Sequence, residues 1–283
     1  MTKILKFAAP MVVLALSSTA LAGCDGSDIS INGKEGVPLS EVEIAGPPPS
    51  ELVLSSGDTV ILTEGETFAI KVEGQDTESL RFVRDSEVIG ITRTDGWSGN
   101  QTATIRITMP PPSEVVIAGS GTVQAQSLAS TSEISIGGSG TISFTNVAAE
   151  RLDVNIGGSG KVTGAGTAKR LEINIGGSGD VELAGLKADS AEVSIGGAGD
   201  VAFASDGTVE ANIAGSGDVK VAGSAKCTVN AFGSGRLTCA PVASGATAAI
   251  PAPVETPETP PTTPGVPIAP KAPTAPIVAK PAQ

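Results

Sequence analysis

Three aspartates follow glycine turns at nearly equal spacing and could bind a cation. Asp180, Asp200 and Asp218 each come directly after the last glycine of a GSG or GAG sequence. Calcium prefers carboxylate oxygens, but calcium-binding β-helix repeats place the aspartate two residues after the glycine in a nine-residue repeat. Lys161 and Arg236 fill the same position in other turns. We therefore expect these aspartates to cap turns, with no bound metal and no cofactor.

Residues suited to catalysis are scarce. The chain has no histidine among its 283 residues, which excludes a histidine nucleophile, general base or metal ligand. No pair of acids stands out at positions suited to glycoside hydrolysis, and the repeated region has no long loops to build a substrate groove. We expect a protein that is not an enzyme. The alternative is a degenerate carbohydrate-active β-helix enzyme that acts on envelope or extracellular polysaccharide.

The first cysteine belongs to an export signal. Cys24 ends the sequence LAGC, which follows two lysines and an apolar stretch from Ala9 to Leu16. This order predicts that residues 1–23 are a signal peptide. LAGC resembles the bacterial lipobox, so we expect acylation of Cys24 and membrane anchoring through the lipid; cleavage after Ala22 without lipidation is the alternative. The predicted location is the bacterial cell envelope, either periplasmic or surface-exposed.

The other two cysteines, Cys227 and Cys239, stand near the end of the glycine-rich region. Once Cys24 carries a lipid, an even number of cysteines remains in an oxidising compartment, which favours a disulfide between them. Two separate buried thiols are the alternative.

The composition describes an acidic chain with few aromatic residues. The formal net charge is -12, and the chain contains 36 glycines, 20 prolines, one tryptophan and no tyrosine. An acidic chain lacks the positive patches that bind DNA or RNA, so no nucleic-acid partner is expected. A core without large aromatic side chains must be narrow and filled by valine, isoleucine, leucine and alanine.

A glycine turn that recurs every 18–20 residues must position all these groups. Its last glycine is Gly121, Gly140, Gly160, Gly179, Gly199, Gly217 or Gly235. Apolar residues stand two positions after each of these glycines, and four and six positions before the next, which predicts two short alternating strands per period. The period fits one coil of a parallel β-helix, whereas the pattern of a leucine-rich repeat is absent. We expect an all-β, single-stranded parallel β-helix of about seven coils.

A polar column lies between the two inward positions of the second strand in each coil. Its members are Ser135, Asn155, Asn174, Ser194, Asn212 and Asn230. Stacked amides and hydroxyls can hydrogen-bond to one another along such a column. The same strip could instead meet a glycan or an envelope protein, so it is the candidate binding site.

Composition divides the chain into four parts. After the signal peptide, residues 24–40 are expected to be a lipidated N-terminus and tether, and residues 41–240 the β-helical domain, with regular coils over 113–240. Irregular strands before residue 113 are expected to form early coils or to cap the helix end, because an open strand edge recruits other chains. Residues 241–283 are rich in Pro, Ala and Thr, which predicts a disordered tail.

The run SEVVIAGSGTV, the later GGSGDV and the preceding TIRITMP resemble the head GIN domain of putative auto-transporter adhesins. The resemblance covers about residues 41–240 and rests on the turns and on the junction between ITMP and GSG. It implies a β-helical module of the cell envelope, often exported and sometimes lipid-anchored. We interpret the protein as a cell-envelope lipoprotein with a non-catalytic, adhesin-like binding or structural module.

Overall fold

The computed structural model describes residue 31 and residues 33–94 and 103–240. The predicted signal peptide, Cys24 and the predicted tail lie outside the described residues. Within them the chain forms sixteen strands and two short 3-10 helices. In chain order these are η1 (Leu39–Glu41), β1 (Glu51–Leu54), β2 (Thr59–Glu64), β3 (Ala69–Gly74), η2 (Thr77–Ser79), β4 (Leu80–Arg84), β5 (Val88–Arg93), β6 (Ala103–Met109), β7 (Glu114–Ile117), β8 (Thr122–Ala125), β9 (Thr131–Ile136), β10 (Thr141–Ile156), β11 (Lys161–Ile175), β12 (Asp180–Ile195), β13 (Val201–Gly215), β14 (Asp218–Ala222), β15 (Lys226–Gly233) and β16 (Arg236–Ala240).

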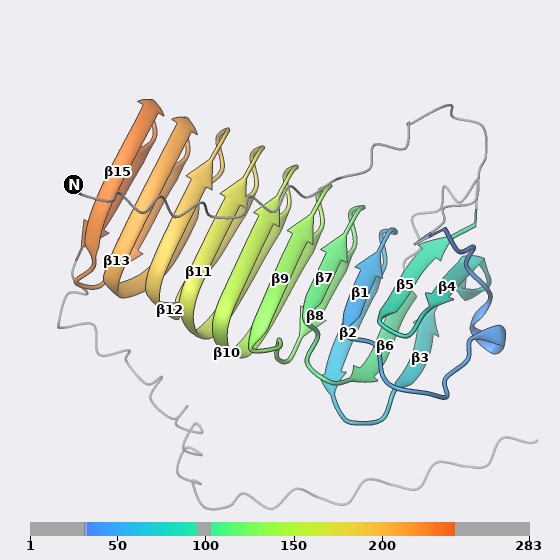
Figure 1. Cartoon of the computed structure of the whole chain (residues 1–283). Coiled ribbons are helices and arrows are strands. Elements are labelled where there is room, and N and C mark those ends of the chain that lie inside the picture. Colours follow the sequence, from blue (N-terminus) through green and yellow to red (C-terminus); the bar gives the residue numbers. More distant parts are fainter. Residues whose placement is uncertain (1–30, 32, 95–102, 241–283) are drawn as a thin grey trace, which may run out of the picture. The chain divides into compact units, whose positions relative to one another are not determined.

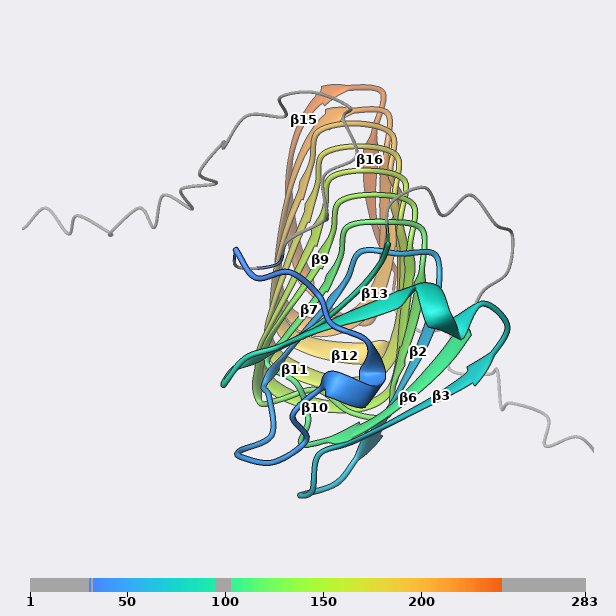
Figure 2. The same cartoon turned by 90° about the vertical axis from the view of Figure 1, so that its right-hand side faces the viewer.

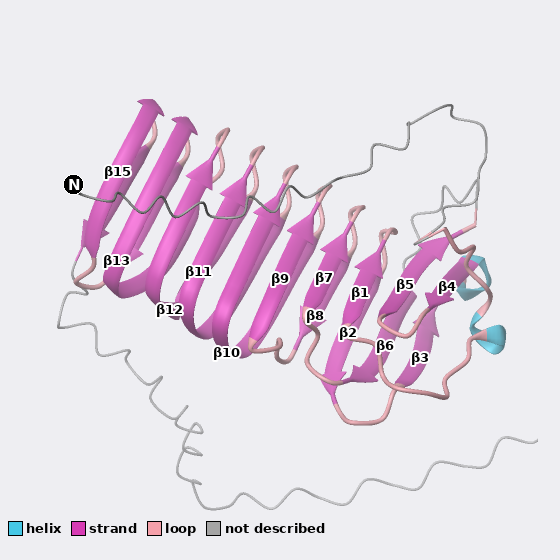
Figure 3. Ribbon diagram, in the orientation of Figure 1, coloured by secondary structure: helices cyan, strands magenta, loops and turns pink. Residues whose placement is uncertain are grey.

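The regular part is the predicted parallel β-helix of about seven turns (Figure 1). Each long strand from β10 to β13 wraps around a corner, so its first half belongs to one sheet and its second half to the other. Each coil from β10 to β13 pairs in parallel with the coil on either side of it, and Figure 2 shows the coils one behind another. Among the residues that the structure describes, the helices are two short 3-10 turns, which lie beside β3 and β4 at one end of the solenoid (Figure 3).

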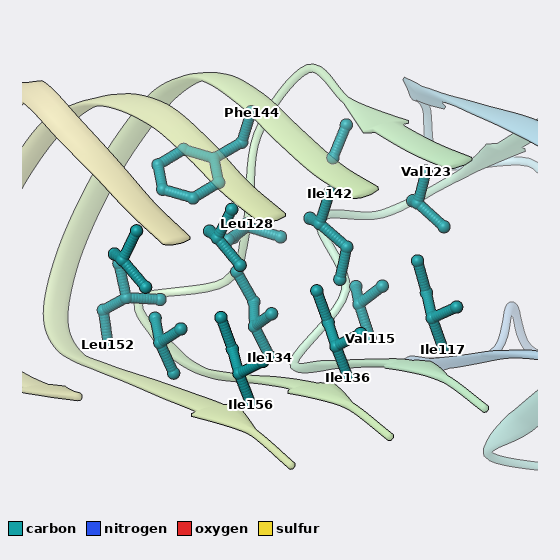
Figure 4. Packing of buried hydrophobic residues seen from close by; sticks show 14 of the residues in the cluster. Val115, Ile117, Val123, Leu128, Ile134, Ile136, Ile142, Phe144, Leu152 and Ile156 are labelled. Carbon is teal, nitrogen blue, oxygen red and sulfur yellow. The ribbon is translucent and has the colours of Figure 1, made fainter. Parts of the chain in front are cut away.

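The core lies between the two sheets and consists mainly of the predicted valine, isoleucine, leucine and alanine side chains. It also contains buried phenylalanines, which the prediction of a core without aromatic side chains missed: Phe68, Phe82, Phe144 and Phe203. Val123, Ile142, Val162 and Val181 form one inward column with no exposed surface, and the column of Ile136 and its equivalents faces them. Figure 4 shows such side chains from successive coils pointing into the same narrow space. The predicted phase of the repeat is therefore correct for the buried coils.

The second glycine of each GGSG or GGAG turn permits close contact between coils. A methyl group at Gly177 would lie 2.2 Å from the carbonyl oxygen of Gly158, and Gly158 has the same relation to Gly138. No side chain fits there, because heavy atoms do not approach to that distance. A positive φ, which glycine adopts without steric cost, is found at later turn positions such as Gly215 and Gly233.

The early strands form both coils and a cap, and the coils are out of sequence order. β1 pairs in parallel with β5 on one side and with β7 on the other, and β2 lies in the same way between β6 and β8. The coil made by β1 and β2 therefore lies between two coils that both come later in the chain, one made by β5 and β6 and one made by β7 and β8. β3 and β4 then close the end by antiparallel pairing with β6 and β5.

A buried ion pair joins the enclosed coil to its neighbour. Asp58 precedes β2 and has no exposed surface, and Arg93 at the end of β5 is also buried. The Arg93 guanidinium donates to both carboxylate oxygens of Asp58. The Ala103 backbone N–H and the Ser56 hydroxyl also donate to this carboxylate, at 2.7 Å each.

Part of the predicted tether packs against the cap. Val37 exchanges backbone hydrogen bonds with Phe82 of β4, at 2.9 and 2.8 Å. Val42 is buried in the core, and Val37 and Leu39 pack against it. The ordered domain therefore begins before residue 41.

Candidate amide strip and groove

The six residues of the predicted binding strip lie in register on one sheet. Asn155 pairs with Ser135 on one side and with Asn174 on the other, and the same column continues through Ser194 and Asn212. Asn230 of β15 extends it to the last coil. We call this column the amide strip. Coils repeat about every 4.8 Å, so the strip presents similar groups at a constant interval.

Amides in the strip bind one another, as the structural interpretation of the column expects. Asn174 Nδ2 donates to Asn155 Oδ1 at 3.1 Å, and Asn230 Nδ2 donates to Asn212 Oδ1 at 3.0 Å. Ser194 lies between these two pairs. Part of the donor capacity of the strip is used by neighbouring acids, because Asn155 Nδ2 donates to Glu133 at 2.9 Å. Each amide group has further donor or acceptor capacity, which is the capacity that a ligand would use.

A groove of about 560 Å³ runs along the amide strip. Its floor is the column formed by the first glycine of each turn, and Phe232 lines it at the last coil. A methyl group at Gly157, Gly176 or Gly196 would meet nothing closer than a carbonyl oxygen at 3.7–3.9 Å. These glycines are therefore not required by packing, and their missing side chains make the groove.

A column of acids lies beside the amide strip and was not predicted from the sequence. Consecutive members pair across adjacent coils in exact register. They are Glu51, Glu114, Glu133, Asp153, Glu172, Glu192 and Glu210. From Glu133 onward each stands two positions before a member of the amide strip, so the column could have been found by counting residues along the repeat. Like charges directly opposite one another destabilise a sheet, and this face is strongly negative.

One arginine compensates the middle of this acidic column. Arg151 donates to Asp153 at 2.7 Å and to Glu172 at 2.9 Å, and the hydrogen bond to Asp153 is the main reason why its own pKa is raised. Toward the capped end, burial and then the nearby Glu51 and Glu133 raise the pKa of Glu114. Burial and then Glu87 raise the pKa of Glu51.

The three turn aspartates cap the backbone of the next coil. The backbone N–H of Asp218 donates to Asp200 Oδ1 at 2.9 Å, and that of Arg236 donates to Asp218 Oδ1 at 3.2 Å. The N–H of Asp200 lies 3.4 Å from Asp180 Oδ1. Among the described residues, no group of three or more acids or cysteines is arranged to hold a metal ion.

Cys227 and Cys239 come together in the last coil, where a disulfide joins them across 12 positions of sequence. Both side chains occupy inward positions but are only partly buried, because no further coil covers them. The disulfide links β15 of one sheet to β16 of the other. It therefore staples the end of the solenoid.

The fold and repeat are those of a family of adhesin-like domains. The family model described as "Putative auto-transporter adhesin, head GIN domain" matches residues 48–225. The chain belongs to this family, as the sequence resemblance implied. No curated protein is detectably similar in sequence.

Two solved structures share the architecture. One is a putative adhesin from Bacteroides fragilis NCTC 9343, with a TM-score of 0.63 and 20% identity, covering 68% of this chain and 93% of that one. The other is a putative lipid binding protein from Parabacteroides distasonis ATCC 8503, with a TM-score of 0.54 and 18% identity, covering 70% and 94%. At such identities the likeness establishes the fold alone.

The family and these neighbours are described as adhesins or binding proteins rather than as enzymes, and an adhesin-like family indicates a protein of the envelope or cell surface. None of the helices in the described residues has the length and apolar character needed to span a bilayer.

Proposed function

We propose that the protein is a lipid-anchored, non-catalytic adhesin-like module that binds an extended glycan along the amide strip. The observation that carries this proposal is the groove of about 560 Å³ whose wall repeats an amide or hydroxyl once per coil. Polymers of repeating units suit such a periodic wall, because each unit can meet an equivalent group. Membership of an adhesin-like family supports the same role.

The acidic column limits the kind of glycan. It runs parallel to the amide strip, and Glu172, Glu192 and Glu210 lie in the same coils as Asn174, Ser194 and Asn212. The negative charges of these neighbouring carboxylates repel uronate or sulfate groups on a ligand bound along the amide strip. The preferred ligand is therefore a neutral polysaccharide.

The binding test uses the full chain in mild detergent with immobilised neutral and uronate polysaccharides. Each neutral hydrogen bond contributes about 1 kcal/mol, so Asn174→Ala should weaken binding about fivefold. Asn155, Asn174 and Asn212 changed together to alanine should weaken it by about a hundredfold. The matched control changes Ser143, Thr163 and Glu182 to alanine on the opposite sheet and should retain binding.

Several outcomes would contradict this assignment. Equal losses in both triple variants, or tighter binding of uronate polymers, would remove the amide strip from the function. Preferential binding to an envelope protein would change the ligand class. Release of new sugar ends during incubation would favour the enzyme alternative.

A further inference from the structure

The two ends of the solenoid differ in how their strand edges are covered. β3 and β4 cap one end by antiparallel pairing with β6 and β5. At the other end β15 pairs with β13 and β16 with β14. No strand in the described part of the chain covers the outer edges of β15 and β16. Both sheets thus end in open edges, which favour pairing with another strand.

The core is also open at this end. The inward side chain of Val229 is 45% exposed, and beside it the outward side chain of Phe232 is 81% exposed. Ala211, the residue that pairs with Val229 one coil earlier, has no exposed surface. Leu237 is likewise only partly buried, whereas its partner Val219 is fully buried. An apolar end surface of this kind, bounded by open strand edges, is a docking surface.

The sequence beyond β16 is not suited to add one more coil. The last coils repeat every 18 residues, because Asp218 pairs with Arg236 and Thr208 with Lys226. One period after Gly223 and Gly233, whose φ values are +122° and +138°, the sequence has Pro241 and Pro251. Proline holds φ near −65°, so neither turn can be repeated. The sequence after β16 therefore has no glycine at the two positions equivalent to these turn glycines.

We propose that a second copy of the chain covers this end, in a closed dimer with twofold symmetry. A twofold axis perpendicular to the sheets pairs β15 antiparallel with the partner's β15 and keeps inward side chains inward. With the axis at Val229, the two copies of this residue meet in a continuous core. Because the opposite end is capped, pairing stops at two copies instead of continuing into a fibre.

The same register matches the outward side chains. It places Lys226 opposite the partner's Phe232, and Thr228 opposite the partner's Asn230. An ammonium group over an aromatic face is favourable, and a hydroxyl and an amide can hydrogen-bond. The antiparallel arrangement also places the two copies of Lys226 at opposite ends of the paired strands.

The charge distribution favours this end for self-association. The whole chain carries a formal charge of -12, but the stretch 219–240 contains no acid and three cations, Lys220, Lys226 and Arg236. Two acidic molecules that approach by this end therefore bring no carboxylates of the last coil together. Approach by the acidic column would place like charges opposite one another.

The test measures the protein mass of the full chain in mild detergent by sedimentation, without any glycan. The wild type should have twice the monomer mass. Phe232→Lys places a lysine opposite the partner's Lys226 and should halve the mass. Adding Lys226→Glu to this variant should restore the dimer. Ile44→Lys, which alters a residue that is 40% exposed elsewhere, is the control and should remain dimeric.

Hydrogen exchange gives a second measurement. Outer-edge amides of β15 should exchange more slowly as protein concentration rises, and Phe232→Lys should abolish this dependence. A wild-type monomer up to the solubility limit would overturn the proposal, as would a dimer that Phe232→Lys leaves intact. Since no glycan is present, either result is independent of the proposed binding function.

Discussion

Arg93 holds Asp58 through two guanidinium nitrogens, although 35 positions separate the two residues. The contact joins the coil made by β1 and β2 to the later coil that encloses it. Both side chains are removed from water, with 4% and 0% of their surface exposed. A buried charge that loses its partner is strongly destabilising. We therefore expect this pair to contribute to the stability of the capped end.

Asp58→Ala should lower the free energy of unfolding by up to about 3–5 kcal/mol, because the buried guanidinium of Arg93 loses the buried carboxylate and retains the more exposed carboxylate of Asp76 at 3.4 Å. Urea denaturation of the variant and the wild type measures the difference. Glu73→Ala breaks an exposed ion pair to Arg106, with 60% and 49% of the side chains exposed, and should cost less than about 1 kcal/mol. Equal effects would show that the buried pair has no special role.

Low pH should lower the free energy of unfolding of the wild type through protonation of the Asp58 carboxylate. Burial acts to raise the pKa of Asp58, but hydrogen bonds from Arg93, Ser56 and Ala103 lower it below its ordinary value. The stabilisation is complete above the unfolded pKa of about 3.9 and disappears as the pH falls through the folded value. The stability difference between wild type and Asp58→Asn should shrink below about pH 4. A constant difference down to pH 2 would contradict this prediction.

Two adjacent glycines should respond differently to the same substitution. Gly177→Ala places a methyl group 2.2 Å from the Gly158 carbonyl oxygen, whereas at Gly176 the nearest atom is a carbonyl oxygen at 3.9 Å. Overpacking typically costs about 1–3 kcal/mol, so Gly177→Ala should lower the thermal midpoint clearly. Gly176→Ala should leave it almost unchanged. Similar midpoints for the two variants would mean that the coils do not approach as closely as described.

The disulfide should be found in exported protein. Peptide mass spectrometry without reduction should recover a fragment that links Cys227 to Cys239, and reduction should separate it. A bridge closing a loop of this length contributes up to about 3 kcal/mol, so reduction should lower stability most in β15 and β16. Free thiols in freshly exported protein would support the alternative of two separate cysteines.

Acylation of Cys24 predicts membrane attachment. Cys24→Ala should abolish fatty-acid labelling and move the protein from the membrane fraction to the soluble fraction, because acyl chains supply the anchor. A Cys239→Ala variant serves as the control and should remain labelled. Unchanged labelling of the Cys24 variant would remove the lipoprotein assignment.

The regular coils were predictable because their signal is local and repeated. The inward position of Val181 and the outward position of Asn174 both follow from counting residues from the turn glycines. The acidic column could have been predicted in the same way, since Glu133 and its equivalents stand seven residues before the last glycine of each turn.

The enclosed coil could not be predicted in the same way. β1 has neighbours at residues 88–91 and 114–117, and nothing in the sequence of Glu51–Leu54 specifies two such distant partners. The contact between Asp58 and Arg93 could not be predicted either, because neither residue belongs to the repeat. Such pairings depend on tertiary packing, which a single sequence without periodicity does not reveal.

The enclosed position of β1 also sets an order for folding during export. A chain that crosses a membrane from its N-terminus releases residues 51–64 before the strands that pair with them. The two neighbouring coils, made by β5 and β6 and by β7 and β8, have not yet emerged at that point. The outer neighbours become complete only when residues up to Ala125, the end of β8, have emerged. The domain therefore cannot assemble coil by coil from its leading end. In export from the N-terminus, which the proposed signal peptide implies, nearly half of the chain has to emerge before the coil made by β1 and β2 has both neighbouring coils.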